Sequence, residues 1–440
     1  MKDRRLRFLT CGVVGLALVW VGEISAQVPR LPGQPATPTN RHDTPANTQV
    51  GPAAFDPAMV DVQMEFFMEA VNLMARHGMN PKTIQDILSF SADQAELWLE
   101  ELELEIPIST PGTGAGERLR DAMTALIRHH YPGNPDDVLD RLLNEVCKWL
   151  DRYSAYNSPN DWSMMQTRGQ SNRVGVGMAI EVDPEGYLIC YPYPRTPAEE
   201  AGLQTGDRLL EVDGVDIQGL SLVQVSALIR GEPGTSVVLR VMKGFGRATT
   251  YTIERPAEDL PPVFIEEDHT GPIIRIRRID EETVQAIKAN LSRNPLPSSA
   301  TLDLRASPGG DLESTLELAS LFLPTGTLLT RYVERESERA YVTQTAPLFP
   351  DMRLLILQDY GTASAAEVFI AGLVENAPDR VVSQGETTNG KGVVQMPLEL
   401  SNGGRLVLSS GLLFTPHGNE WFGHGLLPSI ENDGRLFPAD

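Results

Sequence analysis

Cysteine and positive charge are scarce in this sequence. Its 440 residues include three cysteines, Cys11, Cys147 and Cys190, and the formal net charge is −22. Three cysteines are too few for a disulfide framework or a metal-binding cysteine motif. We therefore expect Cys147 and Cys190 to be buried free thiols. The excess of negative charge argues against nucleic acid or an anionic membrane surface as the main partner. No metal or other cofactor is predicted.

The apolar run near the N-terminus, from Phe8 to Gly22, is short for a membrane span. It follows a basic segment and precedes Ile24-Ser25-Ala26, which resembles a small-residue cleavage site. This order predicts a signal peptide over residues 1–26, and hence an exported protein, periplasmic or extracellular. Retention at the membrane by an uncleaved N-terminal segment is the alternative. Residues 27–58 are rich in Pro, Thr, Asn and Gln, which is typical of a disordered linker.

A chain of this length needs more than one core, so several domains are expected. Residues 59–171 form the first of them, because apolar residues recur there at helical spacing. The clearest sets are Met64, Phe67, Val71 and Met74, and Val138, Leu142, Val146 and Leu150. The glycine-rich stretch at 112–116 follows no predicted strand and lacks the Lys-Ser or Lys-Thr of a phosphate-binding loop, so it is interpreted as a connection.

Short apolar strands and glycine turns replace the helical pattern at residues 172–257. The run from Thr196 to Gly214 closely resembles a PDZ domain, as does Gly175-Val176-Gly177-Met178 upstream of it. The resemblance implies that an extended peptide adds to a strand while loop amides hold its terminal carboxylate. Gly175, Val176, Gly177 and Met178 are then the candidate peptide-binding loop, with an ordinary turn as the alternative. Arg230 is a candidate relay between this site and the rest of the chain, or simply a rim arginine.

Strands and helices alternate over residues 258–440, and two helices there begin at small residues. Gly309 and Gly310 precede one helix, and Ser364 precedes the other, directly after an apolar strand. A serine at such a turn is placed as nucleophilic serines often are, and a helix N-cap is the alternative, which is favoured for a lone serine in this setting. If the two helix starts converge, the amides of Gly309 or Gly310 and of Ala365 can form an oxyanion hole beside the serine.

A serine nucleophile needs a base, and few candidates exist in this half of the chain. Its histidines, His269, His417 and His424, have loop-like surroundings, and Lys391 is the one lysine after Lys288. Lys391 lies between glycines ahead of an apolar strand, so burial can lower its pKa enough for it to act as a general base. On an extended chain Gln395 shares its face and can orient it. Alternatively, both residues are ordinary surface or strand residues.

Taken in order, these motifs resemble the C-terminal processing peptidases, tail-specific serine proteases with an inserted PDZ domain. The resemblance covers about Asp151 to Glu431, and its segments are Asp151–Tyr156, the PDZ stretch, Asp303–Gly310, Gly361–Glu367, Gly385–Gln395 and Phe414–Pro428. It implies an α+β multidomain fold with a PDZ β-sandwich or barrel and a crotonase-like or Clp-protease-like α/β core, with residues near 151–171 packing on that core. The resemblance also implies a catalytic group of Ser364, Lys391 and Gln395. The chain departs from the family pattern at Ala306, Ser307 and Ser429.

The sequence thus predicts an exported serine endopeptidase that cleaves proteins recognised through their C-terminal tails. Its expected partners are proteins or peptides with free C-termini, together with another copy of the chain or an adaptor. The competing hypothesis is a non-hydrolytic PDZ scaffold or a gated pseudoprotease. A third hypothesis is hydrolysis of a small ester, but no feature of the sequence specifically supports it.

Overall fold

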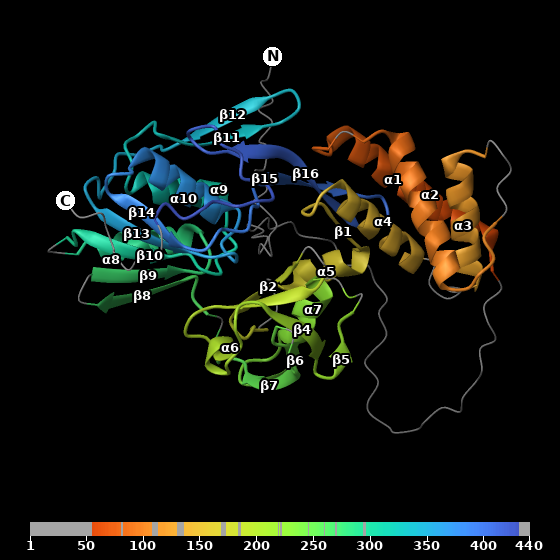
Figure 1. Cartoon of the computed structure of the whole chain (residues 1–440), viewed down its shortest axis with the longest axis horizontal. Coiled ribbons are helices and arrows are strands. Elements are labelled where there is room, and N and C mark those ends of the chain that lie inside the picture. Colours follow the sequence, from red (N-terminus) through yellow and green to blue (C-terminus); the bar gives the residue numbers. More distant parts are fainter. Residues whose placement is uncertain are drawn as a thin grey trace, which may run out of the picture.

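The computed structural model describes residues 55–430, apart from gaps at 81, 108–112, 130–135, 169–172, 184–185, 219, 221, 245, 259, 269–270 and 294–295. These residues form a helical bundle, a small sheet domain and a larger core in which helices pack between and beside two sheets (Figure 1). The predicted signal peptide and nearly all of the predicted linker lie outside the described residues, as does His269. No described helix has both the length and the apolar character needed to cross a membrane.

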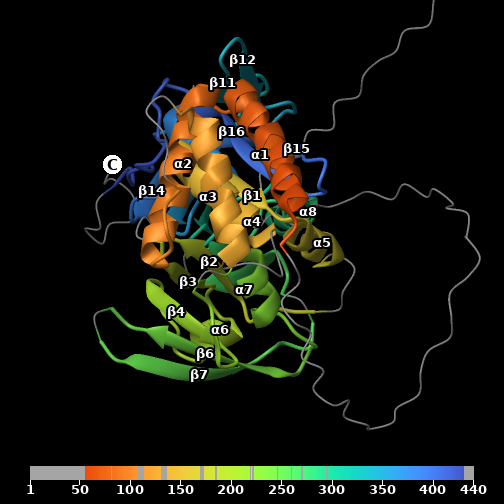
Figure 2. The same cartoon turned by 90° about the vertical axis from the view of Figure 1, so that its right-hand side faces the viewer.

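Four helices make up the N-terminal bundle, and they run alongside one another (Figure 2). They are α1 (Pro57–His77), α2 (Ile84–Glu101), α3 (Ala115–His129) and α4 (Asp136–Leu150). Each buries an apolar stripe at helical spacing, such as Phe67, Val71 and Met74 on α1, as the sequence pattern predicted. Leu406 and Leu408, from a long strand of the core, belong to the same apolar cluster, so the bundle is anchored to the core.

The PDZ-like segment folds into a sheet with the strand order β2-β3-β4-β6-β7, and β5 pairs with β4. Its elements are β2 (Met178–Val182), β3 (Leu188–Pro192), α6 (Pro197–Glu200), β4 (Asp207–Val212), β5 (Val215–Asp216), α7 (Leu222–Ile229), β6 (Ser236–Met242) and β7 (Ala248–Glu254). Strand β2 lies at one edge of the sheet and helix α7 contacts it, which leaves the unpaired edge of β2 beside the helix. Helix α5 (Pro159–Arg168) contacts α7 and leads into this domain.

The core contains a five-stranded sheet with the order β14-β13-β10-β9-β8, in which all neighbours are parallel except β8 and β9. Its strands are β8 (Val263–Asp268), β9 (Gly271–Ile276), β10 (Ser299–Asp303), β13 (Arg353–Gln358) and β14 (Val381–Gly385), and its helices are α8 (Glu281–Leu291), α9 (Leu312–Ser320) and α10 (Ala365–Asn376). The carboxyl ends of parallel strands meet at one edge, so the loops after β10, β13 and β14 come together there.

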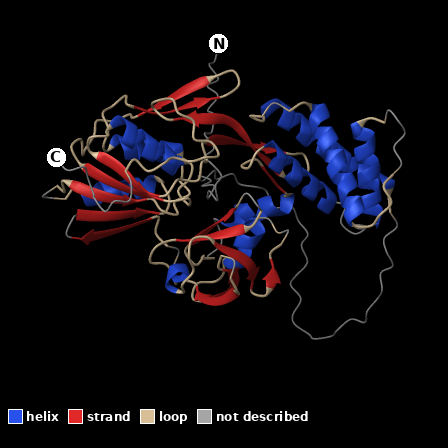
Figure 3. Ribbon diagram, viewed as in Figure 1, coloured by secondary structure: helices blue, strands red, loops and turns tan. Residues whose placement is uncertain are grey.

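A second sheet faces the first across helix α10, which contacts β14 on one side and β11 on the other (Figure 3). It consists of β1 (Ala155–Asn157), β11 (Leu328–Val333), β12 (Glu338–Val342), β15 (Val393–Glu399) and β16 (Arg405–Phe414), with the order β1-β16-β11-β12 and β15 paired to β16. Cys147 and Cys190 are both buried and free, as expected, and lie in different domains.

Candidate active site

Three loops at the carboxyl edge of the parallel sheet are joined by short hydrogen bonds. The Thr362 hydroxyl donates to the carbonyl of Leu304 over 2.9 Å, and the amide of Ala363 donates to the carbonyl of Ser307 over 2.9 Å. The amide of Asn389 donates to the carbonyl of Thr362, also over 2.9 Å. The turn before Ser364 is therefore held against both the Gly309 loop and the Lys391 loop.

Ser364 is the N-cap residue of α10 and has a backbone conformation with φ 58° and ψ −121°. A positive φ is costly for a residue with a side chain and is typical of functional turns. The side chain does not cap the helix, because its Oγ is buried and has no hydrogen-bond partner. The cap position predicted from the sequence is therefore occupied, but the hydroxyl is not used for capping.

Glu367 connects the serine to the lysine. It is fully buried, and its Oε2 accepts from the backbone amides of both Ser364 and Lys391, each over 2.8 Å. Its Oε1 accepts from the Thr388 hydroxyl over 2.6 Å and from the Gly390 amide over 2.8 Å. Burial raises the pKa of the carboxyl, while these four hydrogen bonds oppose the rise. Sequence reasoning missed this role, although an acidic residue three positions after a candidate nucleophile was a usable signal.

Lys391 is buried, with 7% of its surface exposed. Burial lowers the pKa of its amine to about 8, and the carboxylates of Glu181 and Glu367 oppose that shift. A lysine with a pKa near 8 carries a useful fraction of neutral amine near neutral pH, as a general base requires. Because Ser364 Oγ has no hydrogen-bond partner, the serine and lysine side chains are not hydrogen-bonded in this arrangement.

Gln395 is buried on β15, and its side-chain Nε2 donates to the carbonyl of Tyr153 over 2.6 Å. Its Oε1 is buried and has no hydrogen-bond partner, so it is not hydrogen-bonded to the lysine amine. The strand expected after Lys391 is present as β15, but the hydrogen bond expected from the lysine amine to Gln395 Oε1 is not formed in this arrangement. Strand β15 begins at Val393, after Lys391, and its pairing with β16 shifts register between Val394 and Gln395.

The two helix starts do converge. A side chain added at Gly309, where φ is +93°, would lie 2.7 Å from the Ala365 nitrogen. Gly310 bridges to Ile279, whose amide donates to the Gly309 carbonyl and so fixes the turn. Within the described parts of the chain, no hydrogen bond uses the amide of Gly309, Gly310 or Ala365. These amides therefore remain available to an oxyanion.

The predicted peptide-binding loop lies at the start of β2, where Met178 is the first strand residue. The carbonyls of Val176 and Gly177 accept from the amides of Ala198 and Tyr193, each over 2.9 Å, so the loop is anchored through its oxygens. The amides of Gly175, Val176 and Gly177 take part in none of the hydrogen bonds of the described residues.

Arg230 follows α7 directly. Its guanidinium donates to the carbonyl of Arg173 over 3.2 Å, and its Cγ lies 4.0 Å from where a side chain at Gly175 would begin. This places Arg230 beside the peptide-binding loop. Among the described residues, no hydrogen bond of Arg230 reaches the loops that carry Ser364 and Lys391.

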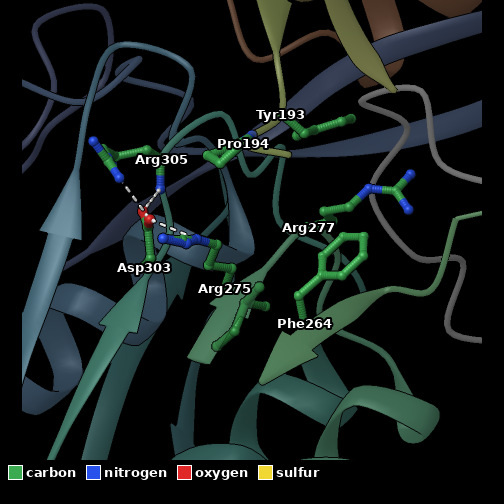
Figure 4. Close-up of a pocket in the computed structure, with 8 residues that line it drawn as sticks. Tyr193, Pro194, Phe264, Arg275, Arg277, Asp303 and Arg305 are labelled. Carbon is green, nitrogen blue, oxygen red and sulfur yellow. Dashed lines mark hydrogen bonds and ion pairs between the residues drawn. The ribbon is translucent and has the colours of Figure 1, made fainter. Parts of the chain in front are cut away.

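The PDZ domain rests directly on the core loops that carry Ala306 and Tyr360. Ala179, Ile189 and Tyr191, on one face of β2 and β3, form a buried cluster with Ala306, and Tyr360 packs against it. A small pocket at the same junction is lined from the PDZ side by Tyr193 and Pro194 and from the core by Phe264 and three arginines (Figure 4). There Arg305 holds Asp303 with two side-chain hydrogen bonds of 2.9 and 2.7 Å.

Comparison with known proteins identifies the family. Residues 273–432 match peptidase family S41, and residues 188–243 match the PDZ domain. A carboxyl-terminal-processing protease of Synechocystis sp. is 31% identical over 297 residues, which are 65% of this chain and 69% of that protein. The chain belongs to the carboxyl-terminal-processing protease family. It is therefore a serine peptidase that acts on protein substrates.

Further relatives agree with this assignment. The carboxy-terminal processing protease CtpA of Bacillus subtilis is 26% identical to this peptidase over 328 residues, covering 73% of this chain and 70% of the relative. The structure of a photosystem II D1 C-terminal processing protease matches with a TM-score of 0.63 and 21% identity, over 86% of this chain and 95% of that one. The expected α+β architecture with a PDZ domain and a protease core is thereby confirmed.

Gln395→Ala should slow the peptidase without preventing substrate binding. The expected orienting bond between Gln395 and Lys391 would form only in the reacting arrangement, because Gln395 Oε1 has no hydrogen-bond partner here. A hydrogen bond to a charged group contributes about 1.5–3 kcal/mol, so losing that bond should lower kcat roughly ten- to hundredfold and leave KM nearly unchanged. Steady-state cleavage of a peptide substrate measures both constants. Gln344→Ala, at an exposed glutamine, is the matched control. Equal kcat values for the two variants would remove Gln395 from the catalytic group.

Proposed function

We propose that this peptidase is an exported endopeptidase that hydrolyses proteins recognised through their C-terminal tails, by acyl transfer through Ser364, Lys391 and Gln395. The observation that carries the proposal is the single carboxylate of Glu367, which binds the backbone amides of both Ser364 and Lys391. It thereby ties together the backbones of two residues, one with a buried hydroxyl and the other with a buried amine of lowered pKa. Export is supported by the signal-peptide pattern of residues 1–26.

In the proposed reaction, the neutral amine of Lys391 takes the proton from Ser364 Oγ as the oxygen attacks the scissile carbonyl. The amides of Gly309 or Gly310 and of Ala365 donate to the developing oxyanion. The lysine then gives the proton to the leaving amine, and an acyl-enzyme remains. Water, deprotonated by the same lysine, releases the acid product and restores the serine.

Substrate choice is assigned to the PDZ domain. A tail can add to the unpaired edge of β2, with its carboxylate held by the amides of Gly175, Val176 and Gly177. Ser364 is 1% exposed while the PDZ face covers Ala306 and Tyr360, so productive binding requires this face to move. Because Ser364, Lys391 and Gln395 are all present, we interpret the burial of Ser364 as the closed state of a gated enzyme and not as a sign of an inert scaffold.

Two tagged peptides that differ only in a free or an amidated C-terminus test the tail hypothesis. Losing the charged carboxylate removes charge-assisted hydrogen bonds of about 1.5–3 kcal/mol, so amidation should raise KM roughly tenfold or more. Cleavage of each peptide by the mature protein is followed by mass spectrometry. A third peptide controls for net charge: it is amidated and carries one additional aspartate residue at its C-terminus, so it has a negative charge but no terminal carboxylate. Equal KM values for the free and amidated tails would contradict recognition through the carboxylate.

A further inference from the structure

Glu181 is a carboxylate of the PDZ domain that faces the protease core. Side chains alternate along β2, so Ile180 enters the PDZ core whereas Ala179 and Glu181 share the opposite face. Ala179 is buried against Ala306 of the protease core. Glu181 therefore projects from the strand proposed to receive peptide tails toward the catalytic loops.

The Glu181 carboxylate is hydrogen-bonded to the catalytic loop. Asn389, two residues before Lys391, donates from Nδ2 to Glu181 Oε2 over 2.7 Å. Asn389 is itself fixed, because its amide donates to the carbonyl of Thr362 and its Oδ1 accepts from the Tyr153 hydroxyl over 3.0 Å. The Tyr153 ring centroid lies 5.9 Å from the Lys391 amine. Glu181 thus belongs to the network that surrounds the lysine.

Two carboxylates act on Lys391, and they differ in what else they bind. Glu367 accepts four hydrogen bonds from Ser364, Thr388, Gly390 and Lys391 itself. Glu181 accepts from Asn389, and it opposes the lowering of the Lys391 pKa more strongly than Glu367 does.

The other charged groups around Glu181 favour its electrostatic interaction with Lys391. Burial raises the pKa of Glu181 to about 7, and the positive charges of Lys391 and then Arg152 oppose the rise. Arg152 donates to the Tyr360 hydroxyl over 2.9 Å, and Tyr153 stays neutral because burial raises its pKa. Lys391 and Arg152 therefore stabilise the ionised form of Glu181 at neutral pH.

The catalytic hydrogen bonds are absent while the PDZ domain is docked. Ser364 Oγ and Gln395 Oε1 are both buried, and neither has a hydrogen-bond partner among the described residues. A general base must reach the proton that it removes, so the lysine and serine side chains must move together before the acyl transfer starts. The lysine is subject to the Glu181 charge and is not hydrogen-bonded to the serine.

We propose that Glu181 is the regulatory counter-ion of Lys391: carried on the peptide-receiving strand, it holds the lysine as an ammonium and away from Ser364 while the PDZ domain is docked. This inference rests on the proposed function. A tail that adds to the unpaired edge of β2 binds the strand that carries Glu181. Displacement of that strand removes the negative charge, the ammonium releases its proton to water, and the neutral amine becomes free to contact the serine.

The test is the pH dependence of Ser364 labelling by a small fluorophosphonate, which does not need to occupy the peptide site. In Glu181→Gln the amide oxygen can still accept from Asn389, so docking is kept and the charge is removed. We expect the acid limb of the labelling rate to move to lower pH by about one unit, the size of shift that one nearby charge produces. The difference should be largest between about pH 7 and 8, where Glu181 of the wild type becomes increasingly ionised while part of Lys391 is still protonated.

Glu254→Gln is the matched control, because it makes the same charge change at an exposed position on β7 of the same domain. Its profile should superimpose on that of the wild type. A Glu181→Gln profile that also superimposes, or that falls at every pH without a shift, overturns the proposal. Glu181→Ala, which removes both the charge and the contact, should shift the limb at least as far.

Casein cleavage separates this proposal from the proposed function. Suppose that at every pH neither the wild type nor Glu181→Gln is labelled at Ser364 or cleaves casein. The peptidase assignment itself then fails, and the regulatory role fails with it. If the wild type is active and Glu181→Gln has the wild-type pH profile, the regulatory role alone fails. A tail peptide should accelerate labelling of the wild type more than that of Glu181→Gln, because the variant has already lost the restraining charge.

Discussion

Replacing either Ser364 or Lys391 with alanine should abolish hydrolysis of casein while leaving the chain folded. Without the serine no acyl-enzyme forms, and without the lysine nothing removes the serine proton. Losing a member of such a catalytic group typically costs about 10⁴-fold or more in kcat. Ser364 Oγ has no hydrogen-bond partner, so its removal leaves no buried group unsatisfied and the fold should be unaffected.

The controls are Lys288→Ala and Ser292→Ala, which make the same chemical changes at exposed positions of α8 and just after it. Both should cleave casein at the wild-type rate. Circular dichroism and thermal unfolding establish whether each variant is folded. Casein cleavage by a folded Ser364→Ala or Lys391→Ala variant would refute the catalytic assignment.

The pH profile of the wild type follows from the same lysine. Burial lowers the pKa of Lys391 to about 8, and only the neutral amine can accept the serine proton. The rate should therefore be low when the amine is protonated and should rise as the pH increases through about 8. A rate that instead decreases over that interval would show that the protonated form is required.

Much of this site was predictable because its residues lie at the ends of regular elements. The strand before Ser364 and the helix after it can be recognised from apolar spacing, and the same holds for the helix after Gly310. Parallel strands bring their carboxyl ends to one edge, so the alternating pattern was compatible with convergence of the Gly309 and Ser364 turns, which remained a condition at the level of sequence. The structure has this convergence.

The remaining contacts depend on long-range packing that no local pattern encodes. The bond between Asn389 and Glu181 joins residues 208 positions apart, and that between Gln395 and Tyr153 joins residues 242 apart. Both depend on how the PDZ domain and the segment after the bundle dock onto the core. The hydrogen bond expected between Lys391 and Gln395 is absent for a different reason: strand β15 begins at Val393, so Lys391 lies in the loop before the strand that carries Gln395.

Glu367→Gln should inactivate the peptidase nearly as completely as loss of the nucleophile, and should also lower its stability. The carboxylate accepts two hydrogen bonds on each oxygen, and all four donors are held by the fold. In glutamine one of these oxygens becomes an NH₂ group, which faces two donors and can accept from neither. Each buried donor left unpaired costs about 1–3 kcal/mol, so for two donors we expect a loss of about 2–6 kcal/mol in the free energy of unfolding.

The effect on catalysis follows from the position of the lost acceptor. If the NH₂ group replaces Oε2, the backbone amides of Ser364 and Lys391 lose their shared partner, and the distance between nucleophile and base is no longer fixed. If it replaces Oε1, the loop at Thr388 and Gly390 is released, and this loop carries Lys391. Displacement of a reacting group by about 1 Å can cost 10²-fold in rate, so either orientation should reduce kcat at least that far.

Denaturant unfolding and fluorophosphonate labelling measure the two effects of Glu367→Gln separately. Glu313→Gln is the matched control, because Glu313 also lies in the first turn of a helix that starts beside the site, but is exposed. Its effect on stability should be within about 0.5 kcal/mol of zero, as for most surface substitutions. Wild-type labelling by Glu367→Gln would mean that Ser364 and Lys391 are held together by other contacts. Normal stability with lost labelling would mean that Glu367 acts on catalysis without supporting the fold.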